Sequence, residues 1–116
     1  MKFIFPNDYS VYLHDTPGHA LFQREKRTFS HGCIRVSRPQ DLAVFLLEEN
    51  DESWTKDRVN TIIQGGERKV VYLQKPIPVN ILYRTAVAIE DGTVFFGEDV
   101  YGRDELLERA LYGCGI

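Results

Sequence analysis

The chain has 116 residues, 43% of them hydrophobic, which is enough for one small domain with an apolar core. Its 14 basic and 17 acidic residues give a net charge of −3, and the basic residues are scattered among acids, which argues against nucleic acid as the main partner. No stretch approaches the roughly twenty consecutive apolar residues of a membrane span.

The first elements in chain order are a strand and a turn around a histidine. Residues 10–14 alternate polar and apolar side chains and include Val and Tyr, which predicts a strand. Residues 16–19 (Thr-Pro-Gly-His) follow, with Pro and Gly at the central positions of a predicted type II turn. His14 should therefore lie at a strand end, where a rigid element can aim its side chain into a cleft. His19 is expected to be a solvated turn residue.

Two helices are predicted next. Ser37 is a candidate N-cap, and Gln40 completes a capping box. The first helix then carries a broad apolar stripe made of Leu42, Ala43, Phe45, Leu46 and Leu47. The second helix is expected over residues 55–64 and ends at Gly65-Gly66, with its inward side chains being Val59, Ile62 and Ile63.

The pattern then changes to a period of two. Strands are predicted over residues 69–73 and 79–89, and Asp91-Gly92 predicts a hairpin turn into a further strand at 93–97. A short helix over 103–112 closes the chain. The expected fold class is β-rich α+β, with helices that follow the loop at residues 30–33.

The chemistry of the chain is concentrated in Ser30-His31-Gly32-Cys33. A cysteine thiolate is a strong nucleophile if a neighbour takes its proton, and His14 and His31 are both close enough in sequence to do so. Gly32 lets the backbone turn tightly, so that consecutive N–H groups can point at a developing oxyanion. The residues alone favour a cysteine nucleophile but do not decide which histidine is the base.

These motifs and their spacing resemble the L,D-transpeptidases, which have a YkuD-type catalytic domain, and in particular their YcbB-like branch. The central match is His14, fifteen intervening residues, and then the segment from Ser30 to Val36. The resemblance covers roughly residues 2–112, and it is carried further by Phe5-Pro6-Asn7, Tyr12 to Pro17, Leu21-Phe22, Pro39-x-x-Leu42-Ala43, Pro78-Val79-x-Ile81, Tyr83-x-Thr85-Ala86 and Asp99-Val100-Tyr101-Gly102-x-Asp104.

The resemblance implies an acyl-transfer enzyme of peptidoglycan biosynthesis and cell-wall biogenesis, important for cell shape and inhibited by carbapenems. Cys33 would attack a donor tetrapeptide stem, release D-alanine and pass the thioester to the amine of a second stem, giving a 3→3 cross-link. His14 would be the general base, held by the backbone carbonyl of Asp15. His31 would position the thiolate or polarise the acyl group, and the N–H groups of Gly32 and Cys33 would form the oxyanion hole.

The substrate-binding residues implied are Ser30, Arg35 and Tyr12. Arg35 departs from the asparagine usual in the family two places after the cysteine. An arginine there could bind a stem-peptide carboxylate bidentately or brace the loop through carbonyl groups.

The family's catalytic domain begins upstream of the segment that Met1 matches. Residues 1–112 are therefore expected to be the C-terminal part of that domain, a partial β-sandwich or barrel, with residues 113–116 as a flexible tail. A sheet without its partners exposes unpaired backbone groups and an apolar face. We therefore expect self-association, or complementation by the missing N-terminal half.

Alternatives remain open for the site and for the function. A zinc site would use His14, His31 and Cys33 with His19 or Cys114, but one residue between His31 and Cys33 is poor ligand spacing. No metal or cofactor is expected, and both cysteines should be free thiols. The chain could instead be a catalytically impaired remnant, a peptidoglycan-binding fragment or an L,D-carboxypeptidase.

The expected location is the cell envelope, in the periplasm, because the implied substrate lies there. The apolar run after Met1 resembles the start of a signal peptide, but Pro6-Asn7-Asp8 ends it early, so no export signal is expected within the chain.

Overall fold

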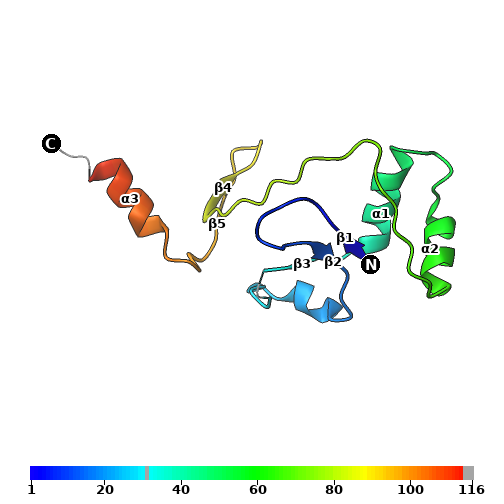
Figure 1. Cartoon of the computed structure of the whole chain (residues 1–116). Coiled ribbons are helices and arrows are strands. Elements are labelled where there is room, and N and C mark those ends of the chain that lie inside the picture. Colours follow the sequence, from blue (N-terminus) through cyan, green and yellow to red (C-terminus); the bar gives the residue numbers. More distant parts are fainter. Residues whose placement is uncertain (31, 114–116) are drawn as a thin grey trace. The chain divides into compact units, whose positions relative to one another are not determined.

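The structure is a computed structural model that describes residues 1–30 and 32–113, and the chain forms two compact units, Met1–Val79 and Asn80–Ile116. The first unit contains β1 (Lys2–Phe3), β2 (Leu13–His14), η1 (a 3-10 helix, His19–Gln23), β3 (Ile34–Arg35), α1 (Pro39–Glu48) and α2 (Lys56–Gln64) (Figure 1). The second unit contains β4 (Ala86–Ala88), β5 (Val94–Phe96) and α3 (Asp104–Tyr112). The fold class is therefore α+β, with short strands.

A three-stranded sheet in the order β1-β2-β3 organises the first unit. β1 and β2 are antiparallel and pair Lys2 with His14, whereas β2 and β3 are parallel and pair His14 with Arg35. Because side chains alternate across a strand, Lys2, His14 and Arg35 share one face of the sheet. The opposite face carries Phe3, Leu13 and Ile34. The sheet thus has one polar and one apolar face.

The expected strand over residues 10–14 forms only at Leu13–His14. The side chain of Asn7 accounts for this, because its Oδ1 accepts hydrogen bonds from the N–H groups of Tyr9 and Val11, both at 3.0 Å. Its Nδ2 also donates to the Val11 carbonyl at 2.7 Å. Ser10 lies within this loop with a φ of +55°, which a strand does not allow.

The turn after β2 is not of type II. A type II turn needs a positive φ at its third residue, but Gly18 has φ −81° and ψ 49°. The His19 N–H donates to the Pro17 carbonyl at 3.0 Å, which is the pattern of an inverse γ-turn centred on Gly18. η1 begins directly after it, at His19, whose side chain is exposed.

Helices α1 and α2 form as the apolar patterns predict, and they hold the core of the first unit. Its buried cluster is Ala43, Trp54 and Val59, with partly buried neighbours Met1, Phe3, Val44, Leu47 and Ile62. Phe3 connects the apolar face of the sheet to this cluster. Two predicted inward side chains are exposed instead, Phe45 at 58% and Ile63 at 45%.

The two helices begin differently. Thr55 caps α2, and its side chain accepts a hydrogen bond from the Arg58 N–H at 3.3 Å. The predicted capping box at Ser37 and Gln40 is wrong, because the N-cap of α1 is Arg38, without a side-chain cap, and Pro39 occupies the first turn. Pro there needs no N–H partner and has a helical φ, so it starts the helix two residues after Ser37.

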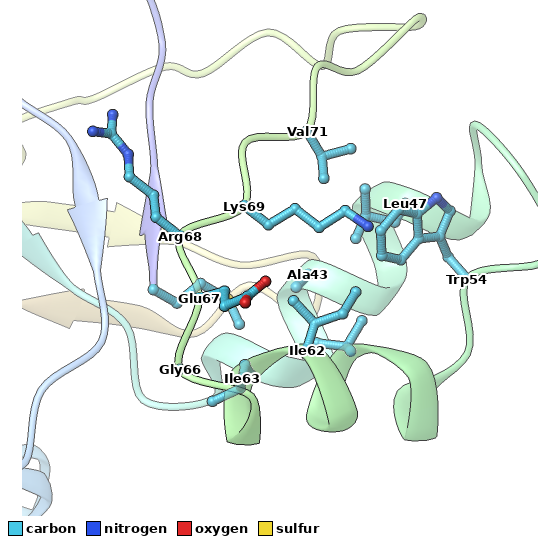
Figure 2. Close-up of a pocket in the computed structure, with 12 residues that line it drawn as sticks. Ala43, Leu47, Trp54, Ile62, Ile63, Gly66, Glu67, Arg68, Lys69 and Val71 are labelled. Atoms are coloured by element: carbon cyan, nitrogen blue, oxygen red, sulfur yellow. The ribbon is translucent and has the colours of Figure 1, made fainter.

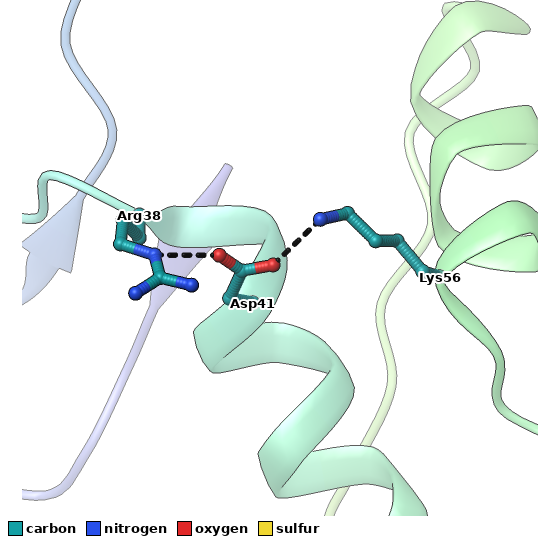
Figure 3. Close-up of polar contacts among 3 residues, drawn as sticks. All are labelled: Arg38, Asp41 and Lys56. Carbon is teal, nitrogen blue, oxygen red and sulfur yellow. Dashed lines mark hydrogen bonds and ion pairs between the residues drawn. The ribbon is translucent and has the colours of Figure 1, made fainter.

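An ion-pair triad links α1 to α2. The Asp41 carboxylate accepts from the Arg38 Nε at 2.7 Å and from the Lys56 Nζ at 2.8 Å (Figure 3). These two side chains, Lys56 first, lower the pKa of Asp41. The aromatic face of Trp54 is covered by cations as well, with the Arg58 guanidinium 4.1 Å and the Lys69 ammonium 5.6 Å from the ring centroid.

The second unit is a hairpin followed by a helix. β4 and β5 are antiparallel around the predicted Asp91-Gly92 turn, where Gly92 has φ +87°. The Asp99 carboxylate accepts from the Tyr83 hydroxyl and from the N–H groups of Arg103 and Asp104, at 2.9 and 2.8 Å. Asp99 thus caps α3 and ties it to the segment before the hairpin.

The prediction of a β-rich chain is wrong for the described residues. The segment 69–73 forms no strand, and of 79–89 only Ala86–Ala88 does. β-branched side chains favour extended backbone, but a strand also needs a partner for its hydrogen bonds. The tail expected at 113–116 lies outside the described residues except for Gly113.

Candidate active site

The pairing of β2 with β3 brings the two halves of the sequence motif together. The Ile34 N–H donates to the Tyr12 carbonyl at 3.1 Å, and the Val36 N–H donates to the His14 carbonyl at 2.8 Å. Cys33 directly precedes β3 and therefore lies beside Tyr12. It comes two residues before Arg35, the residue that pairs with His14. Parallel pairing places the side chains of Tyr12, His14, Cys33 and Arg35 on the same face.

The imidazole of His14 has a defined orientation. Its Nδ1 lies 2.6 Å from the backbone carbonyl oxygen of Asp15. A carbonyl oxygen can only accept, so this hydrogen bond selects the tautomer with the proton on Nδ1 and leaves the Nε2 lone pair available. The Tyr12 ring packs beside it, with ring centroids 5.7 Å apart. The arrangement leaves His14 able to take a proton through Nε2.

Ser30 organises the loop that carries the cysteine. Its Oγ donates to the Cys33 carbonyl and accepts from the Gly32 N–H at 3.3 Å. Gly32 has φ +148°, in the region that favours glycine. His31 lies outside the described residues. The Ser30 hydroxyl is therefore both a donor and an acceptor within the loop, and the Gly32 N–H points at it.

Cys33 is a free cysteine with a partly buried side chain. Among the described residues, no hydrogen bond joins its thiol to the His14 imidazole. Catalytic hydrogen bonds are often long in the absence of substrate and tighten in the complex. The two side chains thus lie on one sheet face without a described hydrogen bond between them.

Two cations flank His14 on this face. Arg35, partly buried, is its partner in β3, and Lys2 is its partner in β1. The Lys2 ammonium lies 4.9 Å from the centroid of the Tyr12 ring. Sequence reasoning overlooked Lys2, although its alternation with the apolar Phe3 indicates the polar face once β1 is recognised.

The carboxylate of Asp15 points away from this chemistry. It pairs with the amino group of Met1 at 3.0 Å, so its contribution to the site is its backbone carbonyl. Within the described ranges 1–30 and 32–113, no group of three or more His, Cys, Asp or Glu side chains is arranged to hold a metal ion. His31 and Cys114, which the zinc alternative would use, lie outside those ranges.

A cavity described in the first unit lies apart from the described site residues. It has a volume of about 410 Å³ and lies between α1, α2 and the segment 66–71. Figure 2 shows Lys69 extending across it toward Trp54. None of the seven predicted site residues that the structure describes lines it. The cavity lies beside the core helices, and the candidate site is the polar face of the sheet.

Comparison with known proteins identifies the family of the chain. The family model of the L,D-transpeptidase catalytic domain, YkuD, matches residues 1–73, which include β1 to β3, the cysteine loop and both core helices. The chain belongs to the YkuD family. A YkuD relative from Haemophilus influenzae, named "Putative L,D-transpeptidase", is 38% identical over 109 residues, or 94% of this chain and 22% of the relative. The chain thus spans about a fifth of the length of this curated relative.

Proposed function

We propose that the chain carries the catalytic cysteine of a peptidoglycan L,D-transpeptidase. The observation that carries the proposal is the His14–Asp15 hydrogen bond on the strand that pairs with the Cys33 loop. It gives His14 the tautomer that a general base needs, and strand pairing supports a Cys33 thiol on the same sheet face. Family membership supports the same chemistry.

The first half-reaction forms a thioester. The Nε2 of His14 takes the thiol proton, and the thiolate attacks the carbonyl at the third residue of a donor tetrapeptide stem. The peptide C–N bond then breaks, and the imidazolium returns the proton to the departing D-alanine amine. The Cys33 N–H, which donates no hydrogen bond described within residues 1–30 and 32–113, would be an oxyanion donor, and the Gly32 N–H would join it after leaving Ser30.

The second half-reaction transfers the acyl group. The side-chain amine of a second stem attacks the thioester, a new amide bond forms, and the thiol is restored, giving a 3→3 cross-link. His14 would take the proton of the attacking amine, and His31 would help to position the thiolate. Tyr12 and Arg35 border the acyl site, whereas Ser30 supports the loop.

This function assigns the chain to the cell envelope. In the part of the chain that the structure describes, no helix is long and apolar enough to cross a membrane. We assign residues 1–112 to one part of a YkuD catalytic domain whose complete form is a β-sandwich or barrel, with 113–116 as its tail. The polar sheet face would then line the substrate cleft of the complete domain.

Intact-mass spectrometry after exposure to a carbapenem tests the function. Carbapenems acylate cysteines of this family, so the folded chain should gain one adduct, which Cys33→Ala abolishes. His14→Ala should slow adduct formation by about 100-fold, the lower range for loss of a general base. His19→Ala is the matched control and should leave the rate unchanged, since that imidazole is exposed and contacts Phe22.

A folded chain that gains no adduct would overturn the proposal and favour a remnant. Where an adduct does form, a stem tetrapeptide given with and without an amine acceptor separates transfer from hydrolysis. A cross-linked product supports the transpeptidase. Release of D-alanine with a free tripeptide stem and no cross-linked product, even when the acceptor is present, indicates an L,D-carboxypeptidase, in which water takes the acyl group.

A further inference from the structure

The polar face of the sheet carries one cationic residue on each outer strand, on either side of His14. Lys2, His14 and Arg35 are consecutive partners in β1, β2 and β3. Neighbouring strands are about 4.8 Å apart, so the backbones of the two cationic residues are about 10 Å apart, on either side of His14. Cys33 comes two residues before Arg35, so both cations lie near the thiol-bearing end of β3.

The position of the Lys2 ammonium is defined by an aromatic ring. It lies 4.9 Å from the centroid of the Tyr12 ring, and that ring is 5.7 Å from the ring of His14. Tyr12 is also the residue beside Cys33 in the β2–β3 pairing. The contact therefore places the ammonium of the exposed Lys2 side chain over the Tyr12 ring, on the face that also carries His14.

Both cations lack an acidic partner. Neither Lys2 nor Arg35 forms an ion pair with a carboxylate among the described residues, while Asp15, the nearest acid in sequence, pairs with the amino group of Met1. Arg38 and Lys56, by contrast, both pair with Asp41. Two unpaired cations on the reactive face form a favourable environment for an anionic ligand.

We propose that Lys2 is a carboxylate-binding residue of this site and that, with Arg35, it selects anionic acyl donors over neutral ones. The inference rests on the proposed function, in which the donor is a peptide with a free terminal carboxylate. The planar guanidinium of Arg35 and the ammonium of Lys2 would bind the carboxylate groups of the donor while His14 and Cys33 act on its amide bond.

The test compares two alkylating agents on a Cys114→Ser chain, in which Cys33 is the remaining cysteine. Iodoacetate carries a carboxylate and iodoacetamide does not, but both react with the same thiolate. The ratio of their rate constants therefore cancels the fraction of thiolate and reports attraction of a carboxylate. Lys2→Gln should lower this ratio about threefold, as expected for one nearby charge in a largely aqueous setting.

Matched variants complete the design. Arg35→Gln should lower the ratio similarly, Lys2→Arg should retain it, and Lys75→Gln should leave it unchanged, since Lys75 is an exposed lysine that follows the core helices. The iodoacetamide rate shows that each variant still presents the thiol. Raising the ionic strength should shrink the Lys2 effect.

The outcomes separate the two proposals. A ratio that is unchanged in Lys2→Gln, in a chain that forms the carbapenem adduct, overturns the role of Lys2 and leaves the function intact. A ratio that falls in a chain that forms no adduct supports the carboxylate site and rejects the transpeptidase.

Discussion

At the scale of single residues, Gly32 shows how the backbone restricts the candidate site. Its φ of +148° is accessible to glycine and strained for other residues, while an added Cβ would meet only Val11 Cγ2, at 4.0 Å. Strain and not crowding therefore makes glycine necessary. The same backbone lets the Ser30 hydroxyl bridge the Gly32 N–H and the Cys33 carbonyl.

Gly32→Ala should destabilise the loop by about 1–3 kcal/mol, the usual cost of a residue in a sparsely populated backbone region. Carbapenem acylation of Cys33 should slow strongly, because the loop would leave the geometry that Ser30 maintains. Urea unfolding and adduct kinetics measure the two effects. Gly18→Ala is the control, because Gly18 has φ −81° and a Cβ there makes ordinary contacts. Equal effects of the two substitutions would contradict this account.

The His14–Asp15 hydrogen bond is also a residue-scale feature. The resemblance alone implied that the Asp15 carbonyl would hold the imidazole, and the structure contains that contact at 2.6 Å. Its catalytic role stays a prediction, tested by the His14→Ala experiment. Sequence spacing could not supply the orientation, because it depends on how β2 ends.

At the scale of elements, the N-termini of α1 and α2 show that a capping motif in the sequence predicts a helix start in one case and fails in the other. Thr55 and Ser37 look alike in sequence, since each precedes a helical apolar pattern. Thr55 caps α2, whereas the helix after Ser37 begins at Pro39. A fixed proline φ outweighed the capping box, because Pro39 favours the first helical position.

Thr55→Ala should therefore lower the free energy of unfolding by about 1 kcal/mol, the typical value of a side-chain N-cap. Ser37→Ala should change it by less than about 0.5 kcal/mol, as expected at an exposed position without a cap bond. Urea unfolding followed by far-UV circular dichroism measures both. A larger loss for Ser37→Ala would show that Ser37 caps α1 in solution.

The Asp41 triad predicts a pH dependence. Hydrogen bonds from Lys56 and Arg38 lower the pKa of Asp41 in the folded chain below its unfolded value. Its contribution to stability is therefore present above about pH 4 and is lost as the pH falls through the folded pKa. Asp41→Asn should reduce the loss of stability between neutral and strongly acid pH.

Urea unfolding at several pH values measures this effect, and Lys56→Met should act in the same direction by removing the main partner of Asp41. Other aspartates with a lowered pKa, Asp51 among them, preserve part of the acid sensitivity. An Asp41→Asn chain with the full acid sensitivity of the parent would contradict the role of the triad.

At the scale of the whole molecule, the described residues bury few apolar side chains. The core cluster is Ala43, Trp54 and Val59, all in the first unit. In the second unit Phe96 is 83% exposed and Leu111 is 65% exposed. Apolar surface in contact with water favours association, and unpaired extended segments such as 69–73 add unsatisfied backbone groups.

The chain should therefore self-associate as its concentration rises from micromolar to millimolar, as measured by sedimentation velocity. Phe96→Ser should weaken the association by removing a large exposed apolar side chain from β5. Glu108→Gln, a polar change on α3, is the control and should have little effect. A single monomeric species over the whole range would be the contrary result.

The sequence by itself determined the local features of this protein. Apolar periodicity indicated α1, α2 and α3, Asp91-Gly92 indicated the hairpin, and His14 with the segment from Ser30 to Cys33 indicated the family. Each of these signals lies within a few consecutive residues or within a motif of fixed spacing. Such signals depend on backbone preferences and side-chain periods that neighbouring residues set.

The tertiary structure decided what depends on residues far apart. The parallel pairing of β2 with β3 put Cys33 beside Tyr12, the pairing with β1 added Lys2 to the same face, and the Asn7 loop shortened the expected strand. Strand register and the existence of a partner strand are nonlocal, so the sequence pattern predicted a strand at 69–73 that does not form and one at 79–89 of which only Ala86–Ala88 forms. The reactive face therefore follows from pairing geometry, and the residues on it follow from the sequence.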